Sequence, residues 1–296
     1  MIAVVGAGAI GGVVAAQLCA LDRHEVALCV RSPFERLVVD GPTRSRTFNP
    51  TIWTTPFAAR PVEWVFIACK AHQSSGIADW LATLAGPATT IAILQNGVEH
   101  RERIAPIAPS ARLLPVIVDC PALRLAPGHV VQRGALALTV EEGEAGRAFA
   151  VLFSESDAKV TVTEDFVTAA WRKLCFNVAG GAITALTNRT LEVIHEPNIE
   201  ALARGLITEC LQVGRAQGAQ LDDALVEQLL DAARRAPAGA VNSMLADRRA
   251  GRPLEADARN GAVVRFGARN SIATPLNHAV NALLLAINAA PGASRA

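Results

Sequence analysis

The first twenty residues restrict the fold of this 296-residue chain more than any other part of it. The segment "IAVVGAGAIGGVVAAQLCA" joins a β-branched apolar run, a glycine-rich turn and an alanine-rich run, the pattern of a strand, a tight turn and a helix. A second apolar run, "EVALCVRS", follows as the next strand. The chain is therefore predicted to begin with a βαβ unit, and so to contain a parallel sheet.

The glycines between the first strand and helix have the spacing G-x-G-x-x-G, at Gly6, Gly8 and Gly11. In this context they allow a tight turn, close approach of the backbone to a pyrophosphate, and close packing of helix on strand. The alternative is that they serve packing alone. We expect a dinucleotide-binding loop, whose cofactor-binding residues are Gly6, Ala7, Gly8, Ala9, Ile10 and Gly11.

The end of the second strand indicates which dinucleotide is bound. An acidic residue there would hold the ribose 2′-hydroxyl of NAD, but the chain has Arg31. A guanidinium suits a 2′-phosphate, so Arg31 favours NADP(H), and Arg36 could assist. The alternative is an exposed arginine at a strand end with no role in binding.

The rest of the chain divides into two parts with different patterns of apolar and polar residues. Up to about residue 165, apolar strands alternate with helices, and short alternating strands in 128–140 and 158–163 suggest an antiparallel addition to the far edge of the sheet. The other predicted strands are 64–70, 89–96 and 112–120, with helices around 74–85 and 98–106. Beyond 165 only helices are expected, at 166–187, 197–218, 222–235, 243–249, 254–269 and 274–289.

We therefore predict an α/β fold. A Rossmann-type doubly wound sheet forms an N-terminal dinucleotide-binding domain, residues 1–165, and an all-helical C-terminal substrate and catalytic domain follows, residues 166–296.

Composition excludes several function classes. The 28 basic residues nearly balance the 27 acidic ones and are scattered, so no nucleic-acid or anionic membrane partner is expected. No apolar run is long enough to span a bilayer, and the N-terminal apolar run is broken by glycines and lacks a basic segment, so a cytoplasmic protein is expected.

Cysteines and histidines show no metal-ligand spacing, and no serine-nucleophile motif occurs. The chain has no tyrosine, which excludes the Tyr-Lys chemistry of short-chain dehydrogenases.

The segment "AAWRKLCFNVAGGAITALTN" is an apolar helix with one polar or small stripe. On a helical period, Lys173, Asn177, Gly181, Thr184 and Asn188 share one face, which must meet something polar. Lys173 has no acidic partner three or four residues away. The alternative to a functional role is a lysine that reaches water from a half-buried helix.

Several motifs, in order along essentially the whole chain, resemble the ketopantoate reductase family (2-dehydropantoate 2-reductases). They are "GAGAIGG", "VRS", "CKAHQ", "LQNGVE", "WRKLCFN", "NSMLADRRAGRPLEADARNG" and "ATP". The resemblance implies that Lys173 is the general acid that protonates the C2 oxygen of the substrate, and that Asn177 binds the substrate by a hydrogen bond.

The same resemblance assigns further residues to the substrate. It implies that Ser243 binds the keto acid near its carboxylate, and that Glu255 contacts its distal hydroxyl and helps to position Lys173. The alternatives are a helix N-cap for Ser243 and a helix N-terminal carboxylate for Glu255.

Two residues at predicted strand ends are also implicated. The resemblance implies that Lys70 lies near cofactor and substrate, and that Asn96 lies near the nicotinamide ribose and the catalytic lysine. The alternatives are a solvated strand end and an Asn-Gly turn, and His72 and Gln73 are weaker candidates.

One position departs from the family pattern. Gly181 stands where the family has a second substrate-binding asparagine, one turn after the first. We expect NADPH-dependent reduction of ketopantoate to pantoate, a step of pantothenate biosynthesis, by a monomer or homodimer. The alternatives are reduction of a different 2-oxo acid, or a non-catalytic NADP(H)-binding sensor.

Overall fold

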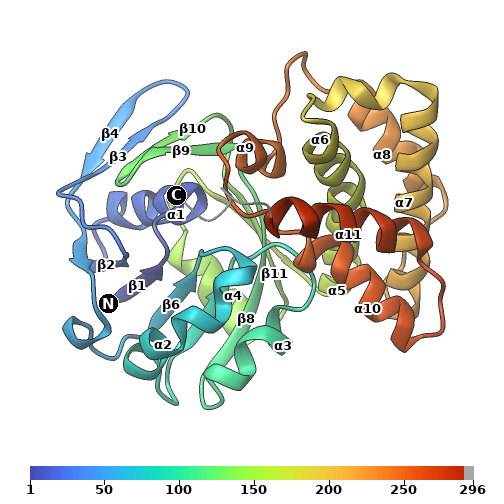
Figure 1. The fold of residues 1–296 in the computed structure, drawn as a ribbon. Helices are drawn as coiled ribbons and strands as arrows, with labels where there is room; N and C mark the ends of the chain where they lie inside the picture. Colours follow the sequence, from blue (N-terminus) through green and yellow to red (C-terminus); the bar gives the residue numbers. More distant parts are fainter. Residues whose placement is uncertain (290–296) are drawn as a thin grey trace. The chain divides into compact units, whose positions relative to one another are not determined.

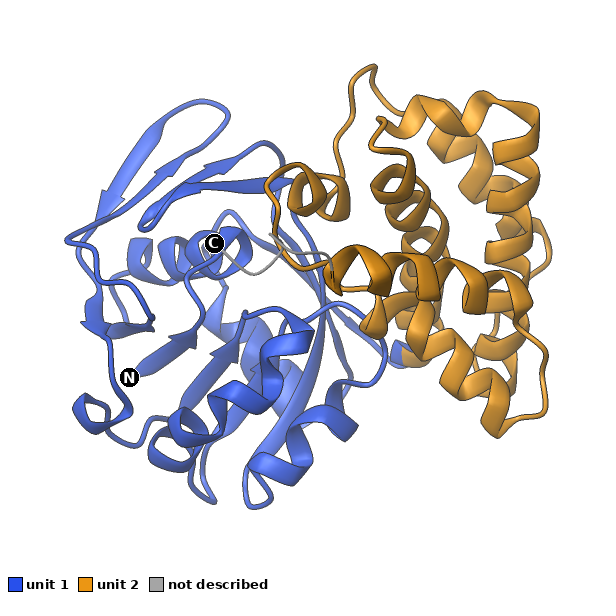
Figure 2. Cartoon of the chain, in the orientation of Figure 1, with its two compact units in different colours: residues 1–166 blue, residues 167–296 orange. Residues whose placement is uncertain are grey.

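The computed structural model describes residues 1–289. The chain divides into two compact units, Met1–Phe166 and Val167–Ala296 (Figure 2). The division falls one residue after the boundary proposed from the sequence.

An eight-stranded sheet forms the centre of the first unit (Figure 1). Its strand order is β12-β11-β8-β7-β6-β1-β2-β5, and all neighbours from β8 to β5 are parallel. Strand β11 is antiparallel to β8, which confirms the antiparallel addition at the far edge. The bounds are β1 Ile2–Val5, β2 Val26–Cys29, β5 Thr51–Trp53, β6 Trp64–Ile67, β7 Thr90–Ile93, β8 Arg112–Asp119, β11 Ala137–Glu141 and β12 Lys159–Thr163.

Both faces of this sheet are covered, as a doubly wound fold requires. Alternate residues of β1 point to opposite sides: Ile2 and Val4 join one apolar core with helix α1, and Ala3 and Val5 join another with α2. The helices of this unit are α1 Ala9–Ala20, α2 Ala78–Leu84, α3 His100–Ile104 and α4 Glu144–Leu152, with 3₁₀ turns at Pro56–Ala58, Ala71–Ile77 and Ala105–Ile107.

A second, four-stranded sheet was not predicted. It has the order β4-β3-β10-β9 and lies against α1 (Figure 1). Its strands are β3 Leu37–Asp40, β4 Ser45–Phe48, β9 Ala122–Ala126 and β10 His129–Gln132. The sequence interpretation of 128–140 as one addition to the main sheet was therefore wrong for β10, although right for β11.

Helix α1 explains why this second sheet is needed. Residues Gly11 to Leu18 of the helix are all buried, so a single covering layer would leave apolar surface in water. The second sheet covers the side of α1 that faces away from β1. Gly12 allows the contact, because a Cβ at this position would lie 2.7 Å from Cγ2 of Val130 in β10.

The described part of the second unit contains helices and no strands (Figure 1). Its helices are α5 Phe166–Phe176, α6 Ala182–Thr187, α7 Pro197–Ala216, α8 Ala224–Arg234, α9 Ser243–Arg249, α10 Ala262–Arg269 and α11 Pro275–Ala289. A 3₁₀ turn covers Leu191–His195. No helix in residues 1–289 combines the length and the apolar character that crossing a membrane demands.

Two of the predicted helices are interrupted. A π-helical turn at Asn177–Gly181, the first π segment, separates α5 from α6 in the stretch predicted as one helix, 166–187. The second π segment, Asp257–Gly261, precedes α10 in the stretch predicted as 254–269. Such turns widen the backbone by one residue and occur frequently at functional sites.

A chain of buried amides ties the two π segments together. Asn260, fully buried in the second π segment, donates through Nδ2 to the Val178 carbonyl of the first (3.0 Å) and to Oδ1 of Asn277 (3.0 Å). Asn277 in turn donates to Glu209 of α7 (2.8 Å), whose carboxylate accepts the backbone N–H of Leu276 and of Asn277 at the start of α11. The network holds the relative position of the two π segments through bonds that are shielded from water.

Candidate active site

The glycine loop has the geometry that the motif predicts. Gly6 has a φ of +98°, and a Cβ there would lie 2.8 Å from the backbone nitrogen of Cys69. A Cβ at Gly11 would lie only 2.0 Å from the Gly6 carbonyl oxygen. Both positions therefore require glycine for packing of the loop itself.

Gly8 differs from the other two glycines because a Cβ there would meet nothing within 4 Å. Gly8 is the N-cap of α1, no side chain caps the helix, and its first turn has no acidic residue. The first backbone N–H groups of a helix lack partners within the helix and carry a partial positive charge. The open space over Gly8 and these N–H groups therefore fit the pyrophosphate of a dinucleotide.

The other predicted cofactor residues follow neighbouring parallel strands of the same sheet. Arg31 comes two residues after β2 and is exposed, Lys70 three residues after β6, and Asn96 three residues after β7; the last two are partly buried. Carboxyl ends of parallel strands share one sheet edge, which is where ligands bind in this architecture. The loop and these three residues are therefore brought to one edge by topology alone.

A buried amide network supports this edge, and the sequence interpretation missed it. Gln95, only 5% exposed, donates through Nε2 to the carbonyls of Cys69 (3.3 Å) and Lys70 (3.4 Å) and lies 3.0 Å from the Ser74 hydroxyl. The backbone carbonyl oxygen of Gln95 is 2.9 Å from Nε2 of His100. The network joins the loops after β6 and β7, and so fixes the backbone on which Lys70 and Asn96 are carried.

Gln73, a weaker candidate for ligand binding, has a structural contact. Its side-chain oxygen accepts the backbone N–H of Lys70 at 3.2 Å, at the start of the Ala71–Ile77 turn. His72 is exposed on the same turn.

Two cysteines of the first unit have thiols that burial keeps protonated. Burial raises the pKa of the Cys29 thiol to about 12 and that of Cys19 to about 11, so neither forms a thiolate near neutral pH. Within residues 1–289, no three His, Cys, Asp or Glu side chains gather as a metal site requires.

In the second unit, Lys173 and Asn177 lie one turn apart on α5 and at the start of the first π segment, and both are partly buried. Further along the predicted stripe, Gly181 and Thr184 are fully buried. Thr184 accepts a hydrogen bond from Asn242 (2.8 Å), and Gly181 lies against the guanidinium of Arg259. These two positions thus meet polar side chains, whereas Asn188, the last position of the predicted stripe, is exposed.

Ser243 is the first residue of α9, but it is not the cap. Asn242 accepts the backbone N–H of Met244 (3.1 Å) and Leu245 (3.0 Å), so the N-cap interpretation of Ser243 was wrong by one residue. The Ser243 hydroxyl instead accepts a hydrogen bond from Nη2 of Arg259 at 3.0 Å.

Glu255 lies just before the second π segment and is 3% exposed. Its Oε2 is 3.5 Å from Nη2 of Arg259, and the side chains of both residues are only 2% exposed. One buried arginine therefore contacts two of the predicted substrate residues, Ser243 and Glu255. The sequence interpretation did not single out Arg259, because a Glu-x-x-x-Arg spacing is common on solvated helix faces.

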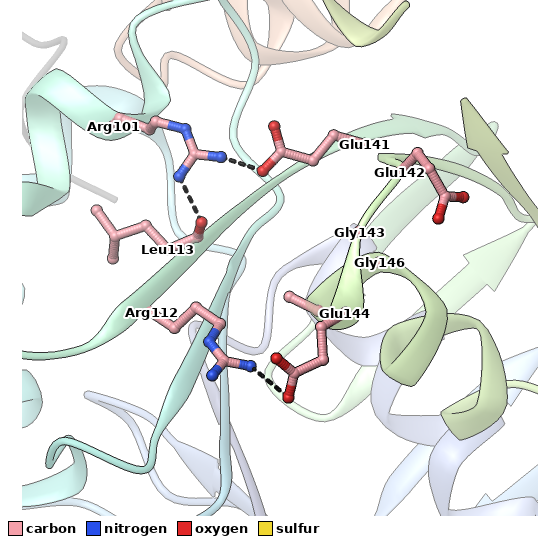
Figure 3. Close-up of a pocket in the computed structure, with 9 residues that line it drawn as sticks. Arg101, Arg112, Leu113, Glu141, Glu142, Gly143, Glu144 and Gly146 are labelled. Carbon is pink, nitrogen blue, oxygen red and sulfur yellow. Dashed lines mark hydrogen bonds and ion pairs between the residues drawn. The ribbon is translucent and has the colours of Figure 1, made fainter. Parts of the chain in front are cut away.

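A pocket of the first unit lies away from the glycine loop. It has a volume of about 340 Å³ and lies beside the start of β8 and the end of β11 (Figure 3). Arg101 pairs with Glu141 and Arg112 pairs with Glu144 across the pocket (Figure 3), and the third glutamate of the lining, Glu142, pairs with Arg147 outside it. The pocket is at the edge where the parallel strands begin, opposite the glycine loop.

A doubly wound sheet with a glycine loop after its first strand, followed by a helical unit that carries a lysine and an asparagine one turn apart, is typical of one class: the two-domain nicotinamide-dependent reductases. The family models agree with this. Residues 2–145 match the model described as ketopantoate reductase PanE/ApbA, and residues 165–288 match its C-terminal model. The chain belongs to the ketopantoate reductase family.

Individual proteins show the same relationship over nearly the full length. A 2-dehydropantoate 2-reductase of Caulobacter vibrioides is 45% identical over 283 residues, which cover 96% of this chain and 97% of that protein. The crystal structure of 2-dehydropantoate 2-reductase from Geobacter metallireducens superposes with a TM-score of 0.89 at 26% identity, covering 96% and 99% of the two chains. A dimeric ketopantoate reductase from Staphylococcus aureus, 23% identical, has a TM-score of 0.87 and coverage of 97% and 98%, and shows the common fold.

Proposed function

We propose that this protein reduces ketopantoate to pantoate with NADPH. The observation that carries the proposal is the buried cluster in which Arg259 contacts both Ser243 and Glu255, because it gathers the residues that the family resemblance assigns to the substrate. The Caulobacter protein of the same activity, similar over 96% of this chain, supports the same reaction.

Each residue has a defined task in this reaction. When bound, NADPH supplies the hydride that reaches C2 of the substrate. Lys173 holds a proton on Nζ and gives it to the C2 oxygen as negative charge develops there. Asn177 and Asn96 orient the substrate and Lys173 by hydrogen bonds, and Glu255 binds the distal hydroxyl.

In the first unit, the backbone N–H groups of Ala9 to Gly11 hold the pyrophosphate, and Gly6 and Gly11 keep the loop in shape for this. Arg31 binds the 2′-phosphate through its guanidinium, and Lys70 lies near cofactor and substrate. We infer that the protein works in the cytoplasm, as a monomer or a homodimer. The dimeric Staphylococcus aureus relative favours the dimer, which sedimentation of the purified protein would test.

The experiment that tests the reaction is NADPH oxidation by purified protein, followed by absorbance, with ketopantoate and a panel of other short 2-oxo acids. We expect the highest kcat/KM for ketopantoate and much weaker use of NADH. No turnover of ketopantoate by a folded protein that binds NADPH would contradict the proposal.

The role of Lys173 is tested by Lys173→Ala. We expect kcat to fall on the order of 100- to 10,000-fold, the range of a general acid, while the Kd of NADPH changes little. The matched control is Lys159→Ala, an exposed lysine of β12, which should leave both values unchanged. Unchanged kcat in Lys173→Ala would remove the lysine from the mechanism.

A second candidate function is reduction of a different 2-oxo acid, and Gly181 is the observation that favours it. An amide missing from the substrate pocket alters selectivity without affecting the fold or the hydride chemistry. In the panel experiment, a preferred substrate that lacks the distal hydroxyl would support this candidate over ketopantoate.

A further inference from the structure

Arg259 occupies the space that the side chain of residue 181 would take. A Cβ built on Gly181 lies 2.7 Å from Nη1 of Arg259, closer than real Cβ contacts, and 3.7 Å from Cβ of Met244. A side chain at position 181 would therefore require the guanidinium, the end of a flexible side chain, to shift from the place it occupies beside Gly181.

The guanidinium lies against three of the positions that the resemblance assigns to the substrate in the second unit. Nη1 lies against Gly181, and Nη2 donates to Ser243 (3.0 Å) and faces Glu255 (3.5 Å). Because Ser243 accepts from Arg259, its own hydroxyl proton remains for another acceptor.

The pairing of Arg259 within the chain is incomplete. Its side chain is 2% exposed, yet Nε has no hydrogen-bond partner among the residues that the structure describes, and Nη2 makes both of the polar contacts above. Buried polar groups are normally satisfied, and a guanidinium offers five N–H donors in a fork that matches a carboxylate.

We propose that Arg259 is a specificity-determining residue that binds the carboxylate of the 2-oxo acid substrate together with Ser243, in place of the amide that is missing at position 181. This inference rests on the proposed reductase function. It predicts that the protein depends more on the substrate's negative charge than a relative with an asparagine at position 181 does.

The first test compares Arg259→Met with the wild type on a 2-oxo acid and on its methyl ester, which lacks the negative charge. We expect the KM of the acid to rise about 10- to 100-fold, the loss of a charge-assisted hydrogen bond, with little change in kcat or in the KM of the ester. The acid-to-ester ratio of kcat/KM is independent of the fraction of folded enzyme. Equal losses for acid and ester, or a fall in kcat at constant KM, would overturn the proposal.

The matched control is Arg235→Met, which removes the same charge from an exposed arginine at the end of α8. We expect its acid-to-ester ratio to equal that of the wild type. An equal loss in both variants would mean that net charge of the unit, and not Arg259, recognises the carboxylate.

A second test uses the steric link and does not need Arg259→Met to fold. Gly181→Asn alone should weaken the reaction, because its Cβ displaces the guanidinium. Adding Arg259→Leu to Gly181→Asn removes the guanidinium that the asparagine would displace, and we expect kcat/KM on ketopantoate to be at least about 10-fold above the product of the two single effects. Independent effects of the two substitutions would overturn the claim that they share one space.

A binding measurement separates this inference from the proposed function. Calorimetric titration with pantoate in the presence of NADP⁺ requires no turnover. If the wild type binds pantoate but reduces no 2-oxo acid, the reaction fails while weaker binding by Arg259→Met still supports the arginine site. If the wild type reduces ketopantoate and Arg259→Met binds pantoate equally well, the reaction stands and the arginine site is refuted.

Discussion

The glycine loop of the first unit and the paired π segments of the second build binding groups from different parts of the chain. The loop uses backbone N–H groups and the absence of side chains, all within Gly6 to Gly11. The π segments use side chains far apart in sequence, where Arg259 contacts Ser243 sixteen residues away and Asn260 contacts Val178 eighty-two residues away. A site built from backbone groups can therefore be predicted from a short stretch of sequence. A site built from side chains depends on how helices from distant parts of the chain pack together.

The largest expected effect comes from breaking the backbone site. In Gly11→Ala the new Cβ would lie 2.0 Å from the Gly6 carbonyl oxygen, and backbone cannot move aside cheaply. We expect the free energy of unfolding to fall by about 3 kcal/mol and NADPH affinity to fall on the order of 100-fold. Thermal unfolding and NADPH titration by fluorescence measure the two effects.

Gly8→Ala tests the effect on cofactor binding separately from the effect on stability. Its Cβ meets no protein atom within 4 Å, so the unfolding temperature should be retained while NADPH affinity still falls, because the methyl group enters the space of the pyrophosphate. Gly76→Ala, also with no atom within 4 Å, serves as the neutral control. Full NADPH affinity in Gly8→Ala would show that the loop does not approach the pyrophosphate closely.

The next substitution removes the buried hydrogen bonds that join the two π segments. Asn260→Ala leaves the Val178 carbonyl and Oδ1 of Asn277 without their buried donor. We expect the second unit to lose about 2–3 kcal/mol of stability, measured by denaturant unfolding, with NADPH affinity retained.

Asn270→Ala is the control for this prediction. Asn270 is exposed and donates only to the Phe266 carbonyl at the end of α10, so its loss should cost less than about 1 kcal/mol. If the two asparagine variants unfold alike, the buried network does not hold the π segments.

The smallest expected effect concerns a single side chain of the first unit. Arg31 is exposed after β2, and its contact with a 2′-phosphate would be partly screened by water. We expect Arg31→Ala to weaken NADPH binding by about 10-fold and to leave NADH binding unchanged, with a smaller effect of Arg36→Ala. If Arg31→Ala weakens the binding of NADPH and of NADH equally, Arg31 does not bind the 2′-phosphate.

Local patterns predicted much of the fold. The strands of the main sheet from β6 to β8 and the helices α7 to α9 lie where apolar periodicity placed them, because their hydrophobic spacing and turn residues act within a few positions. Strands β3, β4 and β9 are short and partly exposed, so their sequences carry little periodic signal. They form because helix α1, buried from Gly11 to Leu18, requires a second covering layer.

The sequence by itself determined the glycine loop, the parallel character of the main sheet and the family, and it predicted the candidate residues Lys173, Asn177, Ser243 and Glu255. These depend on residue type and short spacing, which a chain carries before it folds. Tertiary structure alone decided that two helices open into π segments, that Asn242 and not Ser243 caps α9, and that Arg259 fills the space left by Gly181. The physical reason is that burial, steric exclusion and the satisfaction of hydrogen bonds are properties of neighbours in space, and helical neighbours in this unit come from distant parts of the chain.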